Sequence, residues 1–416
     1  MITVSVFGLG KLGLPLAALL AARGHKVLGY DHSSLVRTKL ASKTYDFEEP
    51  ELIATLLNAG ENFQIVDSPE EAVLGSSVGF VIVPTPSLVN GRFSNQCVID
   101  LFCKIGPAIK EKDSRFIVDL VSTVMPGDSE TNLIPSLCES GGLNFPKDFG
   151  YTYNPEFIAL GSVIKNMEYP DMQLLGTEND ADGDVVAGIL STISLNGAPV
   201  SKMSIFEAEV VKISINNFVT MKISFINAIM QACLGYKNTR IDVISDAIGQ
   251  DSRIGRKYLS GGAPYGGPCF PRDTRALAVF LDASGADSSL PRSTDIVNRS
   301  HGKFLADHIL KRNLKNNPTI LMVGVSYKEN TVVTEESPTI LIGEHLTNLG
   351  ATVKYWNPIN IPEFKSDSLY SGEDQLKIQM SEADITVLCR TLSDCTEQEL
   401  KLIAGASNVI NLWSLD

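Results

Sequence analysis

The chain has 416 residues, 44% of them hydrophobic and 20% charged, which is typical of a soluble globular protein with two or three domains. Its net charge of −13 argues against binding to nucleic acid or to an anionic membrane, because either partner requires a basic face. The seven cysteines are scattered without a CxxC pair, so we expect reduced thiols, no disulfide framework and no metal site.

Apolar strands alternate with helical patterns over residues 1–200, which predicts a doubly wound parallel sheet. The predicted strands are Thr3–Phe7, Lys26–Tyr30, Val78–Val83, Phe116–Leu120 and Met172–Gly176. The sequence opens on a strand without a basic leader, and its longest clean apolar stretch, Leu14–Ala22, is too short to span a bilayer. We therefore expect a cytoplasmic protein.

A glycine-rich turn follows the first predicted strand and opens a helix. Its fingerprint runs through Gly8, Gly10, Leu12 and Gly13, and Asp31 ends the next strand. Such glycines let the backbone approach a pyrophosphate at the helix N-terminus, and the acid accepts hydrogen bonds from a ribose diol while repelling a 2′-phosphate. The pattern predicts NAD as the cofactor.

Two further loops close later strands of the same sheet and are expected to border the ligand crevice. The first, Val83-Pro84-Thr85-Pro86, includes Thr85, and the second, Ser122-Thr123, includes Thr123. Loops at the carboxyl ends of parallel strands line this crevice. Taken alone, each loop is more consistent with a plain turn.

The segment Ile205–Gln231 contains neither proline nor glycine and is apolar on nearly every face, which predicts one long helix buried on most sides. Lys212 and Asn216 lie four residues apart and so project from the same face. One explanation is a snorkelling lysine beside a capped or solvent-facing asparagine. The other is a polar pair with a chemical role.

The most informative segment is Gly261-Gly262-Ala263-Pro264-Tyr265-Gly266-Gly267-Pro268-Cys269-Phe270-Pro271-Arg272-Asp273. Pro271 and Asp273 suit the first turn of a helix, which places Cys269 just before the positive end of the helix dipole. Exposed N–H groups at such an end lower a thiol pKa and can hold an oxyanion. The alternative is a buried structural cysteine in a glycine-rich turn.

The remaining sequence predicts a second α/β domain. A periodic stretch over about 274–312 leads to a buried strand that follows Pro318. The later predicted elements are helix Ser337–Leu349, strand Thr352–Trp356, a helix near Glu382, and strands Ile385–Cys389 and Asn408–Leu412. We expect an α/β protein with two Rossmann-like doubly wound domains, 1–200 and 313–416, joined by a central helical region, 201–312, that contains the long helix.

These motifs together resemble the UDP-glucose/GDP-mannose dehydrogenase family over nearly the whole chain. The shared motifs are the Gly8/Gly10/Gly13 fingerprint, Val83-Pro84-Thr85-Pro86, Ser122-Thr123-Val124, Asn154-Pro155-Glu156-Phe157, Lys212 to Asn227, the segment around Cys269, and Tyr327-Lys328-x-Asn330-Thr331 with Ser337-Pro338. The resemblance implies oxidation of the C6 hydroxymethyl of a nucleotide-linked hexose to a carboxylate with reduction of two NAD. UDP-glucose is the first expected substrate.

The resemblance also implies a role for each site residue. Cys269 traps the aldehyde as a thiohemiacetal, Lys212 and Asn216 stabilise its oxyanion, and Glu156 assists proton transfer. Asp273 and Thr123 hold the base or ordered water that takes the hydroxyl proton. The implied substrate contacts are Glu156, Phe157, Lys212, Asn216, Tyr265, Gly266 and Lys328. Family proteins bury the long helix in a dimer interface, so a homodimer is expected.

The chain departs from the family pattern at several positions. Leu160 replaces a second glutamate, and Glu335 inverts the charge of an arginine that precedes Glu-Ser-Pro. Arg272 replaces a lysine, which keeps the charge but not its geometry. Two further differences are Ala228 and Asn357.

Two other functions remain open from the sequence. The same chemistry could act on GDP-mannose or a UDP-N-acetylhexosamine. A non-catalytic nucleotide-sugar sensor is the other reading, because one carboxylate and one arginine are absent. The retention of Cys269, Asp273, Lys212 and Asn216 argues against a sensor, since a binding protein has no need of an activated thiol.

Overall fold

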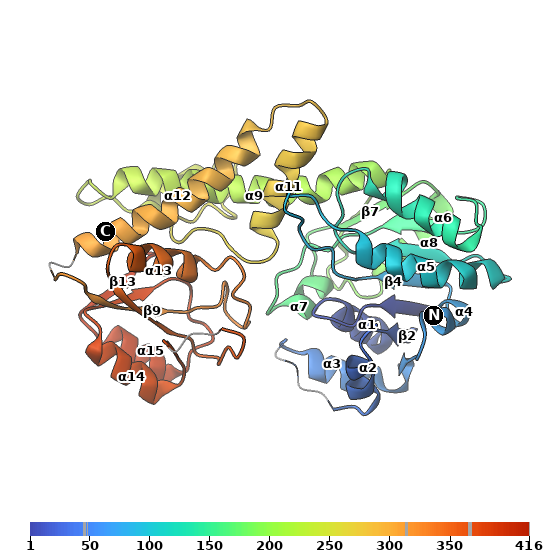
Figure 1. Cartoon of the computed structure of the whole chain (residues 1–416), viewed down its shortest axis with the longest axis horizontal. Helices are drawn as coiled ribbons and strands as arrows, with labels where there is room; N and C mark the ends of the chain where they lie inside the picture. Colours follow the sequence, from blue (N-terminus) through green and yellow to red (C-terminus); the bar gives the residue numbers. More distant parts are fainter. Residues whose placement is uncertain (45–46, 48, 313–314, 365–367, 416) are drawn as a thin grey trace. The chain divides into compact units, whose positions relative to one another are not determined.

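The computed structural model describes residues 1–44, 47, 49–312, 315–364 and 368–415. These residues form two compact units, Met1–Lys212 and Ile213–Asp416, each built around its own sheet (Figure 1). Both sheets have doubly wound strand orders, which confirms the predicted α/β class with two Rossmann-like domains. The three-part division at residues 200 and 312 stays a prediction.

The first unit contains an eight-stranded sheet in the order β3-β2-β1-β4-β5-β6-β7-β8. Its strands are β1 (Thr3–Phe7), β2 (Lys26–Tyr30), β3 (Phe63–Ile65), β4 (Val78–Val81), β5 (Ile117–Leu120), β6 (Gly150–Tyr153), β7 (Gln173–Thr177) and β8 (Val200–Met203). All neighbouring pairs are parallel except β6 and β7. Five strands were predicted within two residues at each end, whereas β3, β6 and β8 were missed.

Helices cover both faces of this sheet, because alternate strand residues are apolar on each side (Figure 1). One face packs against α1 (Gly13–Ala22), α3 (Leu52–Ala59), α7 (Val163–Glu168) and α8 (Asp180–Leu190), and the other against α4 (Pro69–Gly75), α5 (Gln96–Glu111) and α6 (Ile134–Gly141). The unit also contains α2 (Ser34–Ala41), a 3₁₀ turn at Gly60–Asn62 and a π-helical turn at Ser129–Leu133. This layering leaves the loops at the carboxyl ends of the strands available for a ligand.

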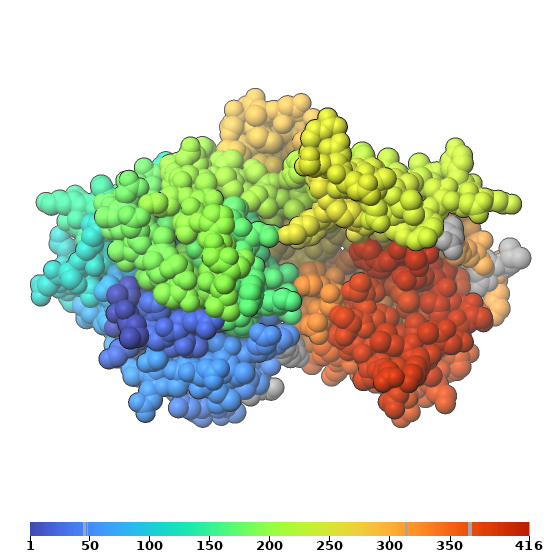
Figure 2. Space-filling view, turned by 180° about the vertical axis from the view of Figure 1, so that it is seen from behind, coloured from blue at the N-terminus to red at the C-terminus, as the bar shows by residue number. Residues whose placement is uncertain are grey.

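The long helix α9 (Ile205–Cys233) was predicted within two residues, and most of its side chains are buried or half-buried, as predicted. Phe218 and Phe225, one heptad apart, are 59% and 51% exposed. Its buried side chains include the apolar Ile205, Ile213, Ile226 and Met230 together with a polar set, namely Asn216, Asn217, Thr220, Ser224 and Asn227. Figure 2 shows the yellow-green atoms of the second half of α9 at the surface. Several of the buried polar groups, such as those of Asn216, Thr220 and Ser224, form hydrogen bonds inside the protein.

The second unit contains a five-stranded parallel sheet in the order β11-β10-β9-β12-β13. Its strands are β9 (Thr319–Val323), β10 (Thr352–Trp356), β11 (Leu369–Tyr370), β12 (Ile385–Leu388) and β13 (Val409–Asn411). One face packs against α12 (Ser289–Lys311) and α13 (Pro338–Asn348), and the other against α14 (Glu373–Glu382) and α15 (Glu397–Ala404) (Figure 1). The fold of this unit therefore repeats that of the first on a smaller scale.

Two more helices of this unit are α10 (Ile241–Gly249) and α11 (Phe270–Ala283). The single periodic stretch predicted over 274–312 is in fact two helices, α11 and α12. Gly285, with a φ of +71°, lies in the turn between them, a conformation that glycine adopts readily. Within the described part of the chain, no helix combines the length and apolarity that a membrane crossing requires.

Candidate active site

The turn after β1 has the shape of a dinucleotide cradle. A Cβ on Gly8, where φ is +94°, would lie 2.1 Å from the Ile82 carbonyl oxygen, and one on Gly13 would lie 1.9 Å from the Gly8 oxygen. These two glycines are therefore required by packing. A Cβ on Gly10 would meet nothing within 4 Å, so the backbone there is open to a ligand.

The N-terminus of α1 is suited to an anion. Leu12 occupies the N-cap, and among the described residues no side chain caps this end and no acid lies in its first turn. Exposed N–H groups and the helix dipole therefore both favour a pyrophosphate at this position.

Asp31, just after β2, lies beside this helix end and is 8% exposed. Its Oδ2 accepts from the Leu9 N–H at 2.8 Å, and its Oδ1 accepts from the Ser33 N–H at 2.8 Å. Each oxygen keeps a lone pair for a ribose hydroxyl. The residues present thus fit NAD, as the sequence predicted.

The loops after β4 and β5 are joined to each other at the same edge of the sheet. The Thr85 hydroxyl donates to the Thr123 carbonyl oxygen at 2.7 Å. Ser122 accepts from the Val83 N–H at 2.9 Å and donates to the Val83 carbonyl at 2.7 Å. The structure therefore brings the two predicted loops together on the carboxyl side of the sheet.

Lys212 is held by the loop that follows β6. Its Nζ donates to the Glu156 carbonyl oxygen at 2.8 Å and lies 4.6 Å from the centroid of the Phe157 ring. Lys212 and Asn216 are only 5% and 8% exposed, so a snorkelling lysine and a solvent-facing asparagine are both wrong, whereas an asparagine with a capped side chain is not contradicted. The ammonium instead has a fixed position over an aromatic face.

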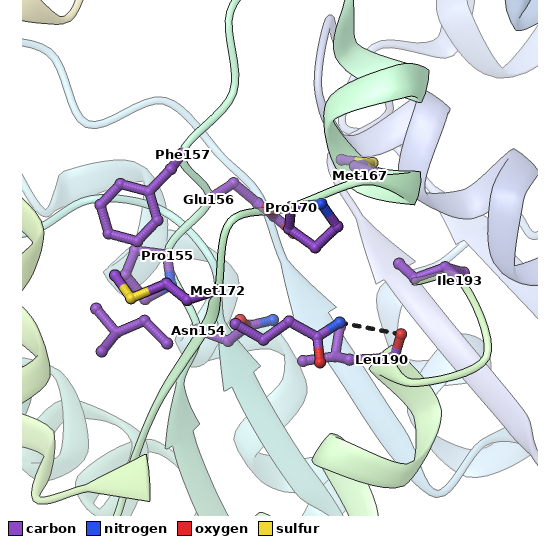
Figure 3. A pocket seen from close by; sticks show the side chains of 11 residues that line it. Asn154, Pro155, Glu156, Phe157, Met167, Pro170, Met172, Leu190 and Ile193 are labelled. Carbon is purple, nitrogen blue, oxygen red and sulfur yellow. Dashed lines mark hydrogen bonds between the residues drawn. The ribbon is translucent and has the colours of Figure 1, made fainter. Parts of the chain in front are cut away.

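Glu156 lies beside a pocket of about 20 Å³ that is lined by both polar and apolar side chains (Figure 3). Removal of the carboxylate from water raises the pKa of Glu156 to about 7, and the nearby Lys212 charge only partly opposes this shift. In Figure 3 the Glu156 side chain extends toward Pro170. The pocket has room for about one water and is too small for a hexose.

The far end of the Glu156 loop is fixed by a distant residue. The Glu49 carboxylate accepts from the Gly161 N–H at 2.8 Å and from the Val163 N–H at 2.6 Å. Two charge-assisted hydrogen bonds thus cap the start of α7 and hold the loop in place. Leu160, which stands where family members usually carry a glutamate, packs on the hydrophobic core of this unit.

In the second unit, Cys269 is the N-cap residue of α11 and is exposed. Pro271 lies in the first turn, as predicted, and the Asp273 N–H donates to the Cys269 carbonyl at 2.8 Å. The positive end of the helix dipole favours a negatively charged sulfur at this position. The alternative of a buried structural cysteine is therefore wrong.

Asp273, one turn into α11, is 1% exposed and has two partners. Its Oδ2 accepts from Asn216 Nδ2 at 2.6 Å, and its Oδ1 accepts from Arg272 Nε at 3.2 Å. The first contact fixes the amide of Asn216, so the Asp273 carboxylate orients Asn216, which is another predicted site residue.

The glycine-rich segment before Cys269 is packed tightly against the C-terminal sheet domain. Asn298 clamps Tyr265 by accepting from its N–H at 2.8 Å and donating to its carbonyl at 2.9 Å. A Cβ on Gly266 would lie 2.1 Å from the Glu336 carbonyl oxygen, and one on Gly267 would lie 2.5 Å from the Tyr327 ring. The need for glycine at both positions is thus explained by contacts within the chain.

Two family models match the sequence. The NAD-binding domain of the UDP-glucose/GDP-mannose dehydrogenase family matches residues 2–194, and the central domain of the same family matches residues 206–300. The chain belongs to the UDP-glucose/GDP-mannose dehydrogenase family. It is therefore an NAD-dependent oxidoreductase of the nucleotide-sugar dehydrogenases, as the resemblance predicted.

Relatives that are named for different substrates have nearly the same sequence identity to this chain. GDP-mannose 6-dehydrogenase of Pseudomonas aeruginosa is 29% identical over 360 residues, covering 85% of this chain and 80% of the relative. UDP-glucose 6-dehydrogenase of Haloferax volcanii is 28% identical over 359 residues, covering 86% and 83%. The structure of a UDP-glucose dehydrogenase from Pyrobaculum islandicum matches with a TM-score of 0.89 and 26% identity, over 100% of this chain and 95% of that chain.

The structure groups the predicted site residues of this dehydrogenase by unit. Thr85 with Thr123, Glu156 with Lys212 and Phe157, and Asn216 with Asp273 are in contact or joined by hydrogen bonds. Lys328 lies on the loop after β9, next to the Tyr327 ring that packs on Gly267. The roles of all these residues stay predictions.

Among the buried carboxyl groups that the sequence did not reveal, two are completely buried. Asp119 lies in β5, and Glu209 lies one turn before Lys212 on α9. Each is 0% exposed, and burial raises each pKa to about 7. The available signal was an acid inside an otherwise apolar strand, in Ile117-Val118-Asp119-Leu120.

Glu335, where the charge differs from the family pattern, contacts the loop before Cys269 through its backbone. Glu335 is exposed, and its carbonyl oxygen accepts from the Gly267 N–H at 3.1 Å. The neighbouring Glu336 pairs with Arg275 of α11 at 2.8 Å. The backbone of Glu335 therefore holds the loop before Cys269, and the side chain of Glu336 holds α11.

Proposed function

We propose that the chain oxidises the C6 hydroxymethyl group of a nucleotide-linked hexose to a carboxylate, with UDP-glucose as the first substrate to test. The observation that supports this proposal most strongly is an exposed cysteine, Cys269, at the N-terminus of α11. Asp273 in the first turn of this helix accepts a hydrogen bond from Asn216 of α9. A dinucleotide cradle in the first unit supports the redox chemistry.

When bound, NAD would accept one hydride from the substrate carbon in each of the two oxidations, so that two NAD molecules would be reduced in turn. The residues that would bind NAD are Gly8, Gly10, Leu12, Gly13, Asp31, Thr85 and Thr123. Asp273 and Thr123 hold the base or water that takes the hydroxyl proton in the first oxidation.

Cys269 is the nucleophile in this proposal. Its thiolate forms a C–S bond to the aldehyde carbon, which gives a thiohemiacetal. Loss of the second hydride leaves a thioester, and attack by water breaks the C–S bond to release the carboxylate and restore the thiol. The helix dipole of α11 supports the thiolate at the N-cap.

Lys212 and Asn216 stabilise the oxyanion of the thiohemiacetal and of the hydrolytic intermediate. Both are already held in place: Lys212 by the Glu156 carbonyl and the Phe157 ring, and Asn216 by Asp273. Fixed donors stabilise developing charge without reorganisation, and one such donor contributes roughly 10²–10³ in rate.

Glu156 transfers the proton in the hydrolytic step. A pKa of about 7 gives this carboxylate a useful basicity at neutral pH, whereas an ordinary glutamate is a much weaker base. Because Leu160 replaces the second family glutamate, Glu156 carries this role without that partner.

The nucleotide is held by the second unit in this proposal, with Lys328 on a phosphate and Tyr265 and Gly266 close to the sugar. Identities of 29% and 28% to enzymes named for GDP-mannose and UDP-glucose do not choose between these substrates. GDP-mannose and UDP-N-acetylhexosamines are therefore the alternatives, and a non-catalytic nucleotide-sugar sensor is the third.

We also propose that two copies associate through α9. The exposed rings of Phe218 and Phe225 lie one heptad apart on α9. Apolar side chains on an exposed helical face are typical of a covered interface. Seven reduced cysteines support a reducing compartment, so we place the reaction in the cytoplasm, where its uronic acid would serve polysaccharide synthesis.

A substrate panel tests the function. Purified protein and NAD are mixed with UDP-glucose, GDP-mannose and UDP-N-acetylhexosamines, and NADH is followed by absorbance. Two NADH per sugar, with a product mass that corresponds to the carboxylate, are expected for the true substrate. Tight binding of a nucleotide sugar without any NADH would instead favour the sensor.

A further inference from the structure

Helix α9 contains a buried carboxyl group that the proposed mechanism does not use. Glu209 is 0% exposed and lies three residues before Lys212, so the two side chains project from the same side of the helix. A buried carboxylate is costly unless it is hydrogen-bonded or paired. We therefore expect Glu209 to have partners of its own inside the protein.

The Glu209 carboxylate accepts two backbone hydrogen bonds from the loop that follows β5. The Gly127 N–H donates to Oε2 at 2.6 Å, and the Ser129 N–H donates to Oε1 at 3.1 Å. These bonds join residues that are 82 and 80 positions apart in the sequence. Hydrogen bonds to a charged acceptor are among the stronger ones in proteins, so α9 fixes the position of this part of the loop.

The same part of the loop is also held by two other elements of the first unit. Asp128 accepts from Arg92 Nη2 at 2.9 Å and from Asn95 Nδ2 at 2.8 Å, which ties the loop to the segment after β4. The Ser129 hydroxyl is hydrogen-bonded to the Tyr151 hydroxyl of β6 at 2.9 Å. The contact with Glu209 therefore completes a set of anchors that leaves the loop a single position.

This loop also carries Thr123, four residues before Gly127. The Thr123 carbonyl oxygen accepts from the Thr85 hydroxyl at 2.7 Å, which holds the other end of the segment. With both ends fixed, the residues between them have little freedom to move. Thr123 is the residue of this loop that we expect to contact NAD.

We propose that Glu209 is a positioning residue for NAD binding, because its carboxylate holds the loop after β5 against α9 and thereby places the Thr123 side chain for the cofactor. This inference rests on the proposed role of Thr123 in the cofactor site. Glu209 has no exposed surface, so it acts through the loop and does not itself touch NAD.

The same turn of α9 holds the neighbouring loop, which follows β6. Lys212 Nζ donates to the Glu156 carbonyl oxygen at 2.8 Å. Glu209 and Lys212 thus fix the ends of two adjacent strands from one rigid helix. Loss of the Glu209 carboxylate should therefore weaken cofactor binding while the contact between Lys212 and Glu156 remains.

Equilibrium binding of NAD in the absence of any sugar tests the proposal. Glu209→Gln keeps the size of the side chain but turns an amide NH₂ group toward one of the two N–H donors, so the loop must shift. Isothermal titration calorimetry of the full-length protein should show a Kd for NAD that is about tenfold higher. An unchanged Kd overturns the proposal.

A matched control lies on the same turn of α9. Glu207 is exposed and accepts from the Ser204 N–H at 2.9 Å and from the Ser204 hydroxyl at 2.8 Å, at the start of its own helix. Glu207→Gln should leave the Kd for NAD unchanged. A rise as large as that in Glu209→Gln would contradict a specific role for Glu209.

A double-mutant cycle separates positioning of Thr123 from a general loss of structure. Thr123→Ala removes the side-chain hydroxyl, keeps the carbonyl that Thr85 holds, and should raise the Kd for NAD about tenfold. Glu209→Gln combined with Thr123→Ala should also raise it about tenfold, since the group through which Glu209 acts is already absent. Independent effects, which multiply to about a hundredfold, would overturn the proposal, and so would an unchanged Kd in Thr123→Ala.

Glu209→Asp decides the question if Glu209→Gln does not fold. The aspartate keeps the charge but is one methylene shorter, so it can reach only one of the two N–H groups. The Kd for NAD should rise about threefold, and this rise should vanish when Thr123→Ala is also present. A rise that persists in the Thr123→Ala background, or no rise at all, overturns the proposal.

The substrate panel separates this inference from the proposed function. If no nucleotide sugar yields NADH, the proposed oxidation fails. Calorimetry with NAD alone still decides the role of Glu209, because it requires neither the sugar nor Cys269.

Discussion

The Asn216 amide donates to the Asp273 carboxylate at 2.6 Å, which ties α9 to the first turn of the helix that Cys269 begins. Asn216→Ala should lower the free energy of unfolding by about 1–3 kcal/mol, because a buried carboxylate loses a donor. Urea unfolding measures this loss. Asn217→Ala is the matched control: it is equally buried on α9, and its Nδ2 has no hydrogen-bond partner among the described residues.

Replacement of the nucleophile should separate the two oxidations. In Cys269→Ser the hydroxyl is a far weaker nucleophile, so we expect complete turnover to be lost and at most one NADH to form per sugar. Single-turnover absorbance and product mass measure the stoichiometry. Cys103→Ser changes another exposed cysteine and should keep two NADH per sugar. Normal two-step turnover in Cys269→Ser would rule out the covalent mechanism.

The raised pKa of Glu156 predicts the direction of the pH dependence. The base is active when deprotonated, so kcat should rise with pH, with a midpoint at about 7, and fall about tenfold for each unit below it. Steady-state NADH release from pH 5 to 9 measures the curve. In Glu156→Gln the residual rate should be low and should lack this limb. If the pH dependence of kcat were unchanged in Glu156→Gln, it would belong to another ionisable group.

Two glycines with positive φ allow the cost of a steric clash to be measured separately from the cost of a strained backbone. Gly267 and Gly255 have φ values of +84° and +71°, but only a Cβ on Gly267 meets another atom, at 2.5 Å in the Tyr327 ring. Gly255→Ala should cost about 1 kcal/mol of stability from the left-handed backbone alone. Gly267→Ala should cost clearly more and also reduce kcat, because the loop before Cys269 must shift. Equal effects in urea unfolding would contradict this explanation.

The exposed aromatic rings of α9 predict the oligomeric state. The double substitution Phe218→Lys and Phe225→Lys should convert a dimer to a monomer, because two charges cannot be desolvated in an apolar interface. Light scattering coupled to gel filtration gives the mass. Leu35→Lys with Leu57→Lys alters two other exposed apolar residues and should leave the mass unchanged. A monomeric parent protein would refute the proposed interface.

Sequence reasoning located the elements that are rich in apolar strand-forming residues. β1, β2 and β10 were predicted to the residue, because each is a five-residue segment that contains valine and at least one aromatic side chain. β6 was missed, since Gly150-Tyr151-Thr152-Tyr153 is short and alternates polar with aromatic residues. Periodicity alone carries too little signal at this length.

The candidate site was predicted where its chemistry lies within one local motif. Cys269, Pro271 and Asp273 share one helix start, so their arrangement followed from helix geometry. Asp119 and Asn298 form hydrogen bonds with residues 35 and 33 positions away, and the sequence held no local signal for either contact.

The hydrogen bonds from Gly161 and Val163 to the Glu49 carboxylate have a practical consequence for protein engineering. A chimaera that exchanges the first sixty residues with those of another dehydrogenase would bring a foreign anchor to the Glu156 loop. Domain shuffling should therefore transfer Glu49 and residues 156–163 as one module, despite the more than one hundred positions between them.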